Sequence, residues 1–252
     1  MNHKLVLITG GSRGLGKNMA LKVAEKGLDV ILTYHQNKEE AHQVVSAIKD
    51  KGQRAVALQL DTSNTSNFLN FQEELQRVLS EVFKVKKIDF LVNNAGIGIN
   101  EAFAETSEAT FDKLVNIHLK GVFFLTQQLL PMLANEGGII NISSGLARFT
   151  MHGYSAYGAM KAAVESLTRY QAKELGKRGI RSNVVAPGAI ETDFGGGLVR
   201  DNKDVNKIVS SQIPLGRVGQ SDDIGGVVAF LCTEEAKWIN GQRIEVSGGQ
   251  NL

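Results

Sequence analysis

The sequence predicts an α/β fold: a doubly wound parallel sheet of about seven strands with helices on both of its faces. Short apolar runs alternate with longer helical patterns along all 252 residues. The strand-like runs are apolar throughout rather than alternating with polar residues, which is typical of strands buried on both faces. No internal repeat or low-complexity linker divides the chain. We therefore expect a single domain spanning residues 1–252.

The elements follow one another in strict alternation. Residues 5–8 form a β-type run, and an apolar helical pattern then extends from 15 to about 26, where Gly27 ends it. The remaining elements, in order, are a strand at 30–33, a helix at 38–50, a strand at 55–60, a helix at 65–82, a strand at 90–92, a helix at 111–133, a strand at 139–142, a helix at 155–177, a strand at 182–185, a helix at 222–231 and a strand at 243–246. Right-handed crossovers would bring the carboxyl ends of these strands to one edge of the sheet, where ligands bind in such folds.

Composition argues against several classes of protein. A net charge of +2 without a block of Lys or Arg offers no electrostatic basis for binding nucleic acid. Cys232 is the only cysteine, and no cluster of His, Asp and Glu suggests a metal, so we expect neither a disulfide nor a metal site. No stretch of about 18 apolar residues and no cleavable leader is present. We expect no membrane association and a cytoplasmic location.

A glycine-rich turn joins the first strand to the first helix. Gly10, Gly14 and Gly16 allow a tight turn, let a pyrophosphate approach the backbone and let the helix pack closely on the strand. The free N–H groups of the helix N-terminus would face the anion. The spacing is Gly-x-x-x-Gly-x-Gly rather than Gly-x-Gly-x-x-Gly, and an ordinary strand-to-helix turn is the alternative. The context favours a dinucleotide-binding Rossmann fold.

The end of the second strand indicates which dinucleotide binds. Enzymes that prefer NAD place an acid there to bind the ribose 2′-hydroxyl, but this strand ends in Thr33-Tyr34-His35-Gln36. Arg13, inside the glycine turn, is suited to a 2′-phosphate, although it is also a plausible solvent-facing residue. His35 is a weaker candidate for the same phosphate. We predict NADP(H) as the cofactor.

A tyrosine and a lysine one helical turn apart form the candidate catalytic pair. Tyr157 and Lys161 share a helix face, so the ammonium can lie beside the phenol. A nearby cation favours phenolate, and a decrease of ~3 units from a phenol pKa of about 10 requires about 4 kcal/mol. Ser144, thirteen residues before Tyr157, would donate to a substrate oxygen. A solvated helix face is the alternative interpretation of this spacing.

These features together resemble the short-chain dehydrogenase/reductase family over essentially the whole chain. The matching residues are Thr9-Gly10-x-x-x-Gly14-x-Gly16, Asn93-Asn94-Ala95-Gly96, Asn116, Ser144, Tyr157-x-x-x-Lys161, Pro187-Gly188 and Gly241-Gln242…Gly248-Gly249. The resemblance implies that Tyr157 is the general acid, that Lys161 lowers its pKa and holds the nicotinamide ribose, and that Ser144 polarises the substrate carbonyl. It also implies that Asn116 anchors a proton-relaying water.

The resemblance further implies a set of cofactor contacts. Asp61 would bond the adenine, Asn93 would shape the adenosine side, and Ile190 and Thr192 would contact the nicotinamide carboxamide. The remaining cofactor-binding candidates are Ser12, Leu15, Tyr34, Thr62, Ala95, Gly96, Pro187 and Gly188, with Tyr157 and Lys161. His118 is interpreted as structural.

The substrate is expected to be a small molecule with a carbonyl or alcohol group, bound by the loop at about 191–213. Gly195-Gly196-Gly197 in this loop indicates mobility. Nearby apolar residues favour a medium-sized, mostly apolar ketone or aldehyde: Leu146, Phe149, Met151, Phe194 and Leu198. The family resemblance also implies a homotetramer assembled through the helices at 111–133 and 155–177.

Within the family the chain is similar to carbonyl reductases and to 3-oxoacyl-[acyl-carrier-protein] reductases. The latter dock an acidic carrier with basic residues, often at the helix end before strand five, but residues 132–138 contain none; Lys173 and Arg178 remain on a later helix. We therefore expect an NADPH-dependent stand-alone carbonyl reductase. The alternatives are a 3-oxoacyl-[acyl-carrier-protein] reductase and a non-catalytic NADP-sensing or scaffold protein.

Overall fold

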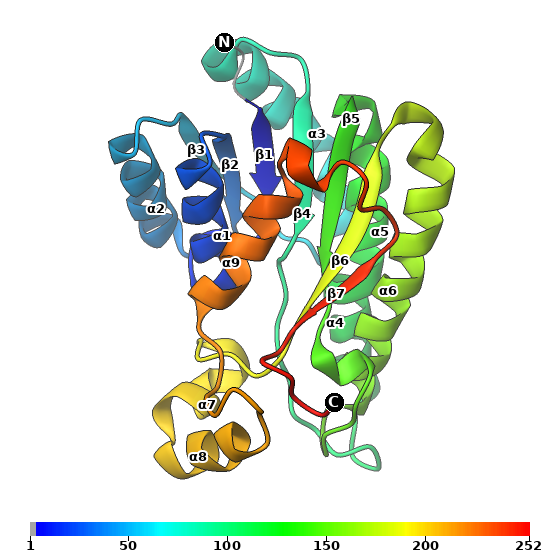
Figure 1. Ribbon diagram of the computed structural model, residues 1–252. Helices are drawn as coiled ribbons and strands as arrows, with labels where there is room; N and C mark the ends of the chain where they lie inside the picture. Colours follow the sequence, from blue (N-terminus) through cyan, green and yellow to red (C-terminus); the bar gives the residue numbers. More distant parts are fainter. Residues whose placement is uncertain (1–3) are drawn as a thin grey trace.

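The fold is built on one seven-stranded sheet in the order β3-β2-β1-β4-β5-β6-β7, with every neighbouring pair parallel (Figure 1). The computed structural model describes residues 4–252. The strands are β1 (Leu5–Ile8), β2 (Asp29–Tyr34), β3 (Ala55–Gln59), β4 (Ile88–Asn93), β5 (Leu133–Ile142), β6 (Arg181–Pro187) and β7 (Arg243–Val246). The predicted doubly wound parallel sheet is confirmed.

Helices cover both faces of this sheet. They are α1 (Gly14–Glu25), α2 (Lys38–Asp50), α3 (Phe68–Val78), α4 (Glu108–Val115), α5 (Gly121–Leu129), α6 (Ser155–Leu175), α7 (Leu198–Asp201), α8 (Lys203–Ser211) and α9 (Ser221–Leu231). Figure 1 shows α1, α2 and α9 on one face, with α3, α5 and α6 on the other. Burial on both faces explains why the strands are apolar throughout.

Two of the long helices predicted from the sequence are interrupted. The expected helix at 111–133 is α4, then one π-helical turn at Asn116–Lys120, then α5 and a short 3-10 turn at Leu130–Met132. The strand β5 already begins at Leu133, six residues before the prediction. The expected helix at 65–82 likewise ends in a π-helical turn, at Leu79–Phe83. Apolar periodicity predicts that a helix is present, but it does not reveal the single extra residue that turns part of the helix into a π-helical turn.

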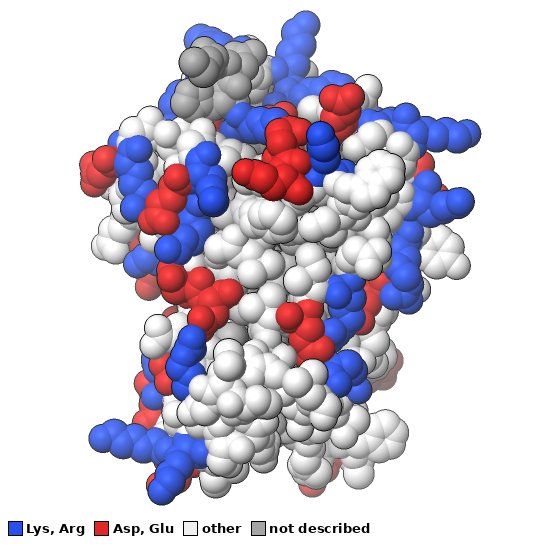
Figure 2. Space-filling model, in the orientation of Figure 1, with Lys and Arg blue, Asp and Glu red and all other residues white. Residues whose placement is uncertain are grey.

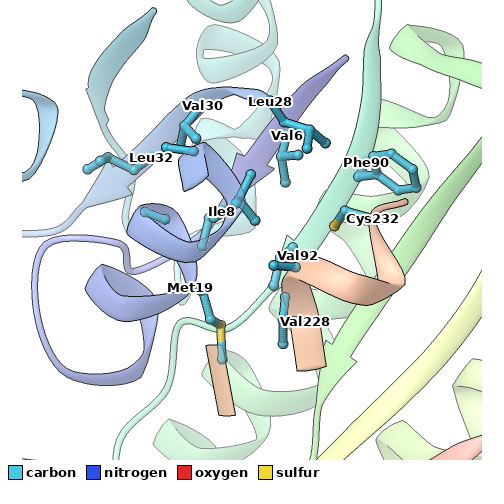
Figure 3. Packing of buried hydrophobic residues seen from close by; sticks show 14 of the residues in the cluster. Val6, Ile8, Met19, Leu28, Val30, Leu32, Phe90, Val92, Val228 and Cys232 are labelled. Atoms are coloured by element: carbon cyan, nitrogen blue, oxygen red, sulfur yellow. The ribbon is translucent and has the colours of Figure 1, made fainter. Parts of the chain in front are cut away.

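Two apolar layers hold the helices to the sheet. On one face, Met19 of α1 and Val228 of α9 pack against Ile8 and Val92 of the central strands (Figure 3). Cys232 lies in this layer, and its burial raises the pKa of its thiol to about 12. The other layer contains residues of α3 and α5. Residues of β1, β2, β4 and β5 contribute to both layers, so these strands are buried on both faces of the sheet.

The segment at 191–213 is not the open loop that the sequence predicted. It contains a 3-10 turn at Phe194–Gly197 and the helices α7 and α8, and we call residues 191–213 the lid. The Asn202 side chain caps α8 by accepting from the Asp204 and Val205 amides at 3.0 and 3.1 Å. A small apolar cluster stabilises the lid: Val209, Ile213 and Val218. Figure 1 shows α7 and α8 below the carboxyl ends of the strands, outside both helical layers.

Candidate active site

The carboxyl ends of the central strands bring the predicted motifs to one edge of the sheet. Ile8 of β1 is paired with Val92 of β4, Asn93 with Asn141 of β5, and Ile142 with Val185 of β6. The glycine turn, the segment after β4, Ser144 and Pro187-Gly188 therefore emerge side by side. This parallel register is why residues scattered over 180 positions can form one site.

Tyr157 and Lys161 lie on the same face of α6 and are both withdrawn from solvent. Tyr157 is 5% exposed and Lys161 is 6% exposed. The Lys161 ammonium lies 5.6 Å from the centroid of the Tyr157 ring and donates a hydrogen bond of 2.7 Å to the Ile142 carbonyl. The Ser144 hydroxyl accepts a hydrogen bond of 3.2 Å from the Leu146 amide and is near enough to Tyr157 to act on the pKa of its phenol. The structure thus brings Ser144, Tyr157 and Lys161 together at the ends of β5 and α6.

The proton affinities of this group differ from the sequence-based prediction. Burial raises the pKa of Tyr157 above its usual value, the Ser144 hydroxyl opposes that effect, and Tyr154 adds to it. The lowered phenol pKa that the sequence predicted is absent in this arrangement, because burial outweighs the influences that favour the phenolate, and burial also lowers the pKa of Lys161 itself to about 7. A lysine with that pKa is only partly charged at neutral pH and exerts a weaker field. Tyr157 therefore carries its proton, as a proton donor must.

The π-helical turn between α4 and α5 supplies Asn116 and His118. Asn116 is half-buried at the start of the turn, and His118, two residues on, is 1% exposed. The His118 ring is neutral: its Nε2 lies 2.8 Å from the Ile97 carbonyl oxygen, and burial first and the Lys161 charge second lower its pKa to about 3. His118 Nδ1 has no hydrogen-bond partner within residues 4–252. The imidazole is thus a buried neighbour of the site, in accord with a structural role.

The glycine turn has the shape that a pyrophosphate requires. Gly10 and Gly14 have φ of +66° and +53°, and a Cβ on Gly16 would lie 2.1 Å from the Gly10 carbonyl oxygen. Arg13 precedes α1 without capping it through its side chain, so the N–H groups of the first turn remain for an anion. The residues present here fit a dinucleotide phosphate.

Asn94 is a site residue that the sequence analysis did not single out. Its side-chain amide donates to the carbonyls of Thr9 and Gly10 at 2.9 and 3.1 Å, which ties the end of β4 to the glycine turn. The Asn93 side chain instead points inward and donates to Thr126 at 3.0 Å and Asn141 at 2.8 Å. The Asn93-Asn94 pair was the available signal, because consecutive residues at a strand end face opposite sides.

The end of the site predicted to bind the 2′-phosphate contains cationic side chains and also carboxylates that could compete with the phosphate for them. The Arg13 guanidinium lies 3.8 Å from the Asp193 carboxylate of the lid. His35 lies 3.6 Å from Asp61. Burial acts to raise the pKa of Asp61, but two hydrogen bonds from Ser63 outweigh it and leave the pKa lowered. The charged groups at this end of the site are thus Arg13, in the turn between β1 and α1, and Asp61, which follows β3.

The remaining predicted cofactor contacts lie along the same edge. Thr192, near the start of the lid, lies next to the glycine turn: a Cβ on Gly14 would be 3.9 Å from the Thr192 Cβ. Ile190 forms a bridge with Gly219. Leu15 is the second residue of α1. The other candidates occupy the ends of strands or the residues after them: Ser12, Tyr34, Thr62, Ala95, Gly96, Pro187 and Gly188.

The described residues show neither a metal centre nor a membrane span. Within residues 4–252, no group of three or more His, Cys, Asp or Glu side chains is arranged to hold a metal ion. None of the helices in the described part of the chain combines the length and apolar character needed to cross a bilayer.

The fold and the site together define a nucleotide-dependent oxidoreductase class, and comparison with known proteins identifies the family. The family model described as enoyl-(acyl carrier protein) reductase matches residues 10–251. The 3-oxoacyl-[acyl-carrier-protein] reductase FabG of Staphylococcus epidermidis is 39% identical over 252 residues, covering 99% of this chain and all of the relative. A short-chain type dehydrogenase/reductase of Picea abies is 34% identical, covering 99% of this chain and 93% of its own.

Solved structures agree with this assignment. The promiscuous reductase LugOII, which catalyses keto-reduction at C1 during lugdunomycin biosynthesis, superposes with a TM-score of 0.93 and 33% identity, over 98% of this chain and 97% of its own. The angucycline C-6 ketoreductase LanV, solved with bound NADP, gives a TM-score of 0.93 and 34% identity, over 98% of this chain and 95% of its own. The chain belongs to the short-chain dehydrogenase/reductase family.

Proposed function

We propose that the protein is an NADPH-dependent reductase that transfers hydride to the carbonyl carbon of a ketone or aldehyde. The observation that carries this proposal is the buried group of Ser144, Tyr157 and Lys161 beside a glycine turn shaped for a pyrophosphate. NADPH, when bound, supplies the hydride. The relatives named as 3-oxoacyl reductases and ketoreductases support a carbonyl, rather than a carbon–carbon double bond, as the reduced group.

Each side chain has a distinct part in this reaction. Ser144 donates a hydrogen bond to the carbonyl oxygen, where negative charge develops. Tyr157 is protonated at neutral pH and transfers its proton to that oxygen. Lys161, with a pKa of about 7, is positioned to stabilise the phenolate and to return a proton to it. Asn116 would hold the water through which that proton arrives.

The local charges favour a stand-alone reductase over one that docks an acyl carrier protein. Arg178, a basic candidate for carrier docking, instead donates to the Leu130 and Leu133 carbonyls at 3.0 and 2.5 Å. It also lies 21 residues after Tyr157, about 30 Å along a helix at 1.5 Å per residue. Lys173, 16 residues after Tyr157, is about 24 Å away by the same rise. Within one subunit, neither cation lies beside the catalytic hydroxyl.

A 3-oxoacyl-[acyl-carrier-protein] reductase is the second candidate, because FabG proteins match this chain over nearly its full length. The test is a panel of acetoacetyl thioesters, simple ketones and aldehydes, each assayed for oxidation of NADPH and NADH. Turnover of the ketones and aldehydes with NADPH supports the first proposal. Turnover confined to acetoacetyl thioesters would favour the second candidate, and no turnover at all would favour the non-catalytic alternative.

We also propose a homotetramer and retain the cytoplasmic location as a prediction. Large apolar side chains are exposed on the helices predicted to assemble: Phe111 on α4, Phe123 and Phe124 on α5, and Tyr170 on α6. Exposed apolar side chains gathered on the surface of a subunit commonly mark a protein–protein interface, and here they suit an isologous interface between subunits. Light scattering coupled to gel filtration would measure the subunit number, and cell fractionation the location.

A further inference from the structure

The catalytic hydroxyl is covered, so a substrate must displace part of its surroundings. Tyr157 is only 5% exposed. Three aromatic side chains contact its ring: His118 at 5.2 Å, Phe194 at 5.4 Å and Tyr154 at 6.2 Å between centroids. His118 is fixed in the interior by Ile97, and Tyr154 immediately precedes α6. Phe194 alone among these three belongs to the lid.

Phe194 is attached in a way that allows it to move. Its side chain is 43% exposed, and the three residues that follow it, Gly195, Gly196 and Gly197, all have positive φ. Its amide donates to the Thr192 hydroxyl at 3.2 Å, within the lid itself. Glycine adopts both signs of φ at little cost, so the backbone after Phe194 can change direction readily. Outward rotation of the lid would take the Phe194 ring away from Tyr157.

The Phe194 ring packs closely against the backbone at Gly98. A Cβ on Gly98 would lie 2.6 Å from two atoms of the ring edge, so the ring rests directly on the bare backbone after β4. Gly98 does not have a positive φ, so its lack of a side chain provides room rather than backbone freedom. Apolar residues line the surroundings of Tyr157: Ile97, Ile99, Leu146 and Met160. Figure 2 shows a largely uncharged area on the lower part of the molecule, the end at which α7 and α8 lie in Figure 1, with charges of both signs around it.

We propose that Phe194 is the specificity-determining residue of the substrate site, and that it selects ketones whose carbonyl carries a planar aromatic ring. This inference rests on the reductase function proposed above. The substrate ring enters as the lid moves outward and lies between Tyr157 and Phe194, over Gly98. Aromatic rings favour such offset or tilted neighbours beyond the benefit of buried area alone, and an aliphatic ring lacks this additional attraction.

The test compares methyl phenyl ketone with methyl cyclohexyl ketone, which share a carbon skeleton and differ in ring flatness. Conjugation changes the intrinsic reactivity of the aryl ketone, so the informative quantity is the change in the aryl-to-cyclohexyl ratio of kcat/KM between variants. We expect this ratio to fall about five-fold in Phe194→Leu, which keeps an apolar side chain but removes the ring, the factor for ~1 kcal/mol. We expect a similar fall in Gly98→Ala, which fills the space beneath the ring.

Ile208→Ala is the control, because Ile208 is also an exposed apolar residue of the lid but lies in α8, after the glycine run that follows Phe194. Its ratio should equal that of the wild type. An unchanged ratio in Phe194→Leu, or an equal fall in Ile208→Ala, would overturn the inference. Calorimetric binding of both ketones in the presence of NADP⁺ provides a readout without turnover. If the wild type reduces neither ketone, the proposed function fails. The binding measurement then decides the inference separately. Tighter binding of the aryl ketone that is lost in Phe194→Leu supports it, and equal binding of the two ketones overturns it.

Discussion

The ring of His118 stands perpendicular to the ring of Tyr157, with 5.2 Å between their centroids and 89° between their planes. Both side chains are buried, and the imidazole is neutral because its pKa is lowered to about 3. The Tyr157 ring therefore packs against an uncharged imidazole, while the Lys161 ammonium lies 5.6 Å from the centroid of the same ring. In the reduction proposed above, we expect this environment to keep the proton on Tyr157 until negative charge develops on the substrate oxygen.

Removal of the Tyr157 hydroxyl should abolish most of the activity and little of the stability. General acid catalysis contributes about 100- to 10,000-fold, so Tyr157→Phe should lower kcat by that factor. The ring contacts with His118 and Phe194 remain, so the melting temperature and NADPH affinity should stay close to wild type. NADPH oxidation, thermal melting and cofactor fluorescence measure these three quantities. A kcat within ten-fold of wild type would remove Tyr157 from the mechanism.

The pH dependence of the reaction should report the titration of Lys161. Burial lowers the pKa of this ammonium to about 7, so its charged form predominates below pH 7 and is lost above it. Reduction requires the charged form to stabilise the phenolate. We expect kcat/KM to be constant below about pH 6 and to fall as the pH rises through 7, approaching ten-fold per unit. A rate that stays constant to pH 9 would contradict this role.

Arg13 should determine the preference for NADPH over NADH. A charge-assisted hydrogen bond to a 2′-phosphate is worth about 1.5–3 kcal/mol, so Arg13→Ala should weaken NADPH binding by about 10- to 100-fold and leave NADH unchanged. Asp193 lies 3.8 Å from Arg13 and competes with the phosphate. Asp193→Asn should therefore strengthen NADPH binding by up to about five-fold, the range of an exposed ion pair. Titration of cofactor fluorescence checks both, and equal losses for the two cofactors would refute the assignment.

Two helical glycines should respond to alanine in opposite directions. A Cβ on Gly121, at the start of α5, would lie 2.2 Å from the Thr62 carbonyl oxygen. That atom belongs to the backbone and cannot rotate away, so Gly121→Ala should cost about 1–3 kcal/mol. Gly226 in α9 has no atom within 4 Å of its Cβ position, so Gly226→Ala should stabilise by about 0.5–1 kcal/mol. Urea unfolding measures the change in the free energy of unfolding for both variants. A change of the same sign in the two would show that crowding by the backbone does not determine the effect of the added methyl group.

His118 should make the protein sensitive to acid. Its pKa is lowered to about 3 in the fold from an ordinary value of 6.5. Between these values the unfolded chain binds a proton that the folded protein does not, so this residue's contribution to stability decreases as the pH falls from 6.5 towards 3. His118→Gln, which keeps a donor for the Ile97 carbonyl, should remove up to about 1.4 kcal/mol per pH unit of that slope. The measurement is the free energy of unfolding of the wild type and of His118→Gln at several pH values. The same slope against pH in both proteins would show that His118 is not responsible.

The local sequence pattern was sufficient to predict the strands of the sheet but not the helices of the lid. Each predicted strand is present because a continuous apolar run between helical patterns has few alternatives. The helices α7 and α8 were not predicted, since Gly195-Gly196-Gly197 and a mostly polar segment are typical of a loop. Asn202 caps α8 through the Asp204 and Val205 amides, and Val209 and Ile213 are one helical turn apart, so a local signal for α8 was present but was outweighed by the glycine run. The position of the lid beside the glycine turn depends on contacts that are distant in sequence, such as that of Arg13 with Asp193, and these leave no local pattern.

The amino-acid sequence by itself determined the parallel sheet, the glycine turn and the spacing of Tyr157 and Lys161, because these depend on short-range periodicity and backbone geometry. Only the tertiary structure decided the proton affinities, since burial of Lys161 lowers its pKa and burial of Tyr157 raises its own. It likewise placed Phe194 over the catalytic ring and turned Asn93 inward while Asn94 braced the glycine turn. The physical reason is that desolvation and contact depend on neighbours brought in from distant parts of the chain.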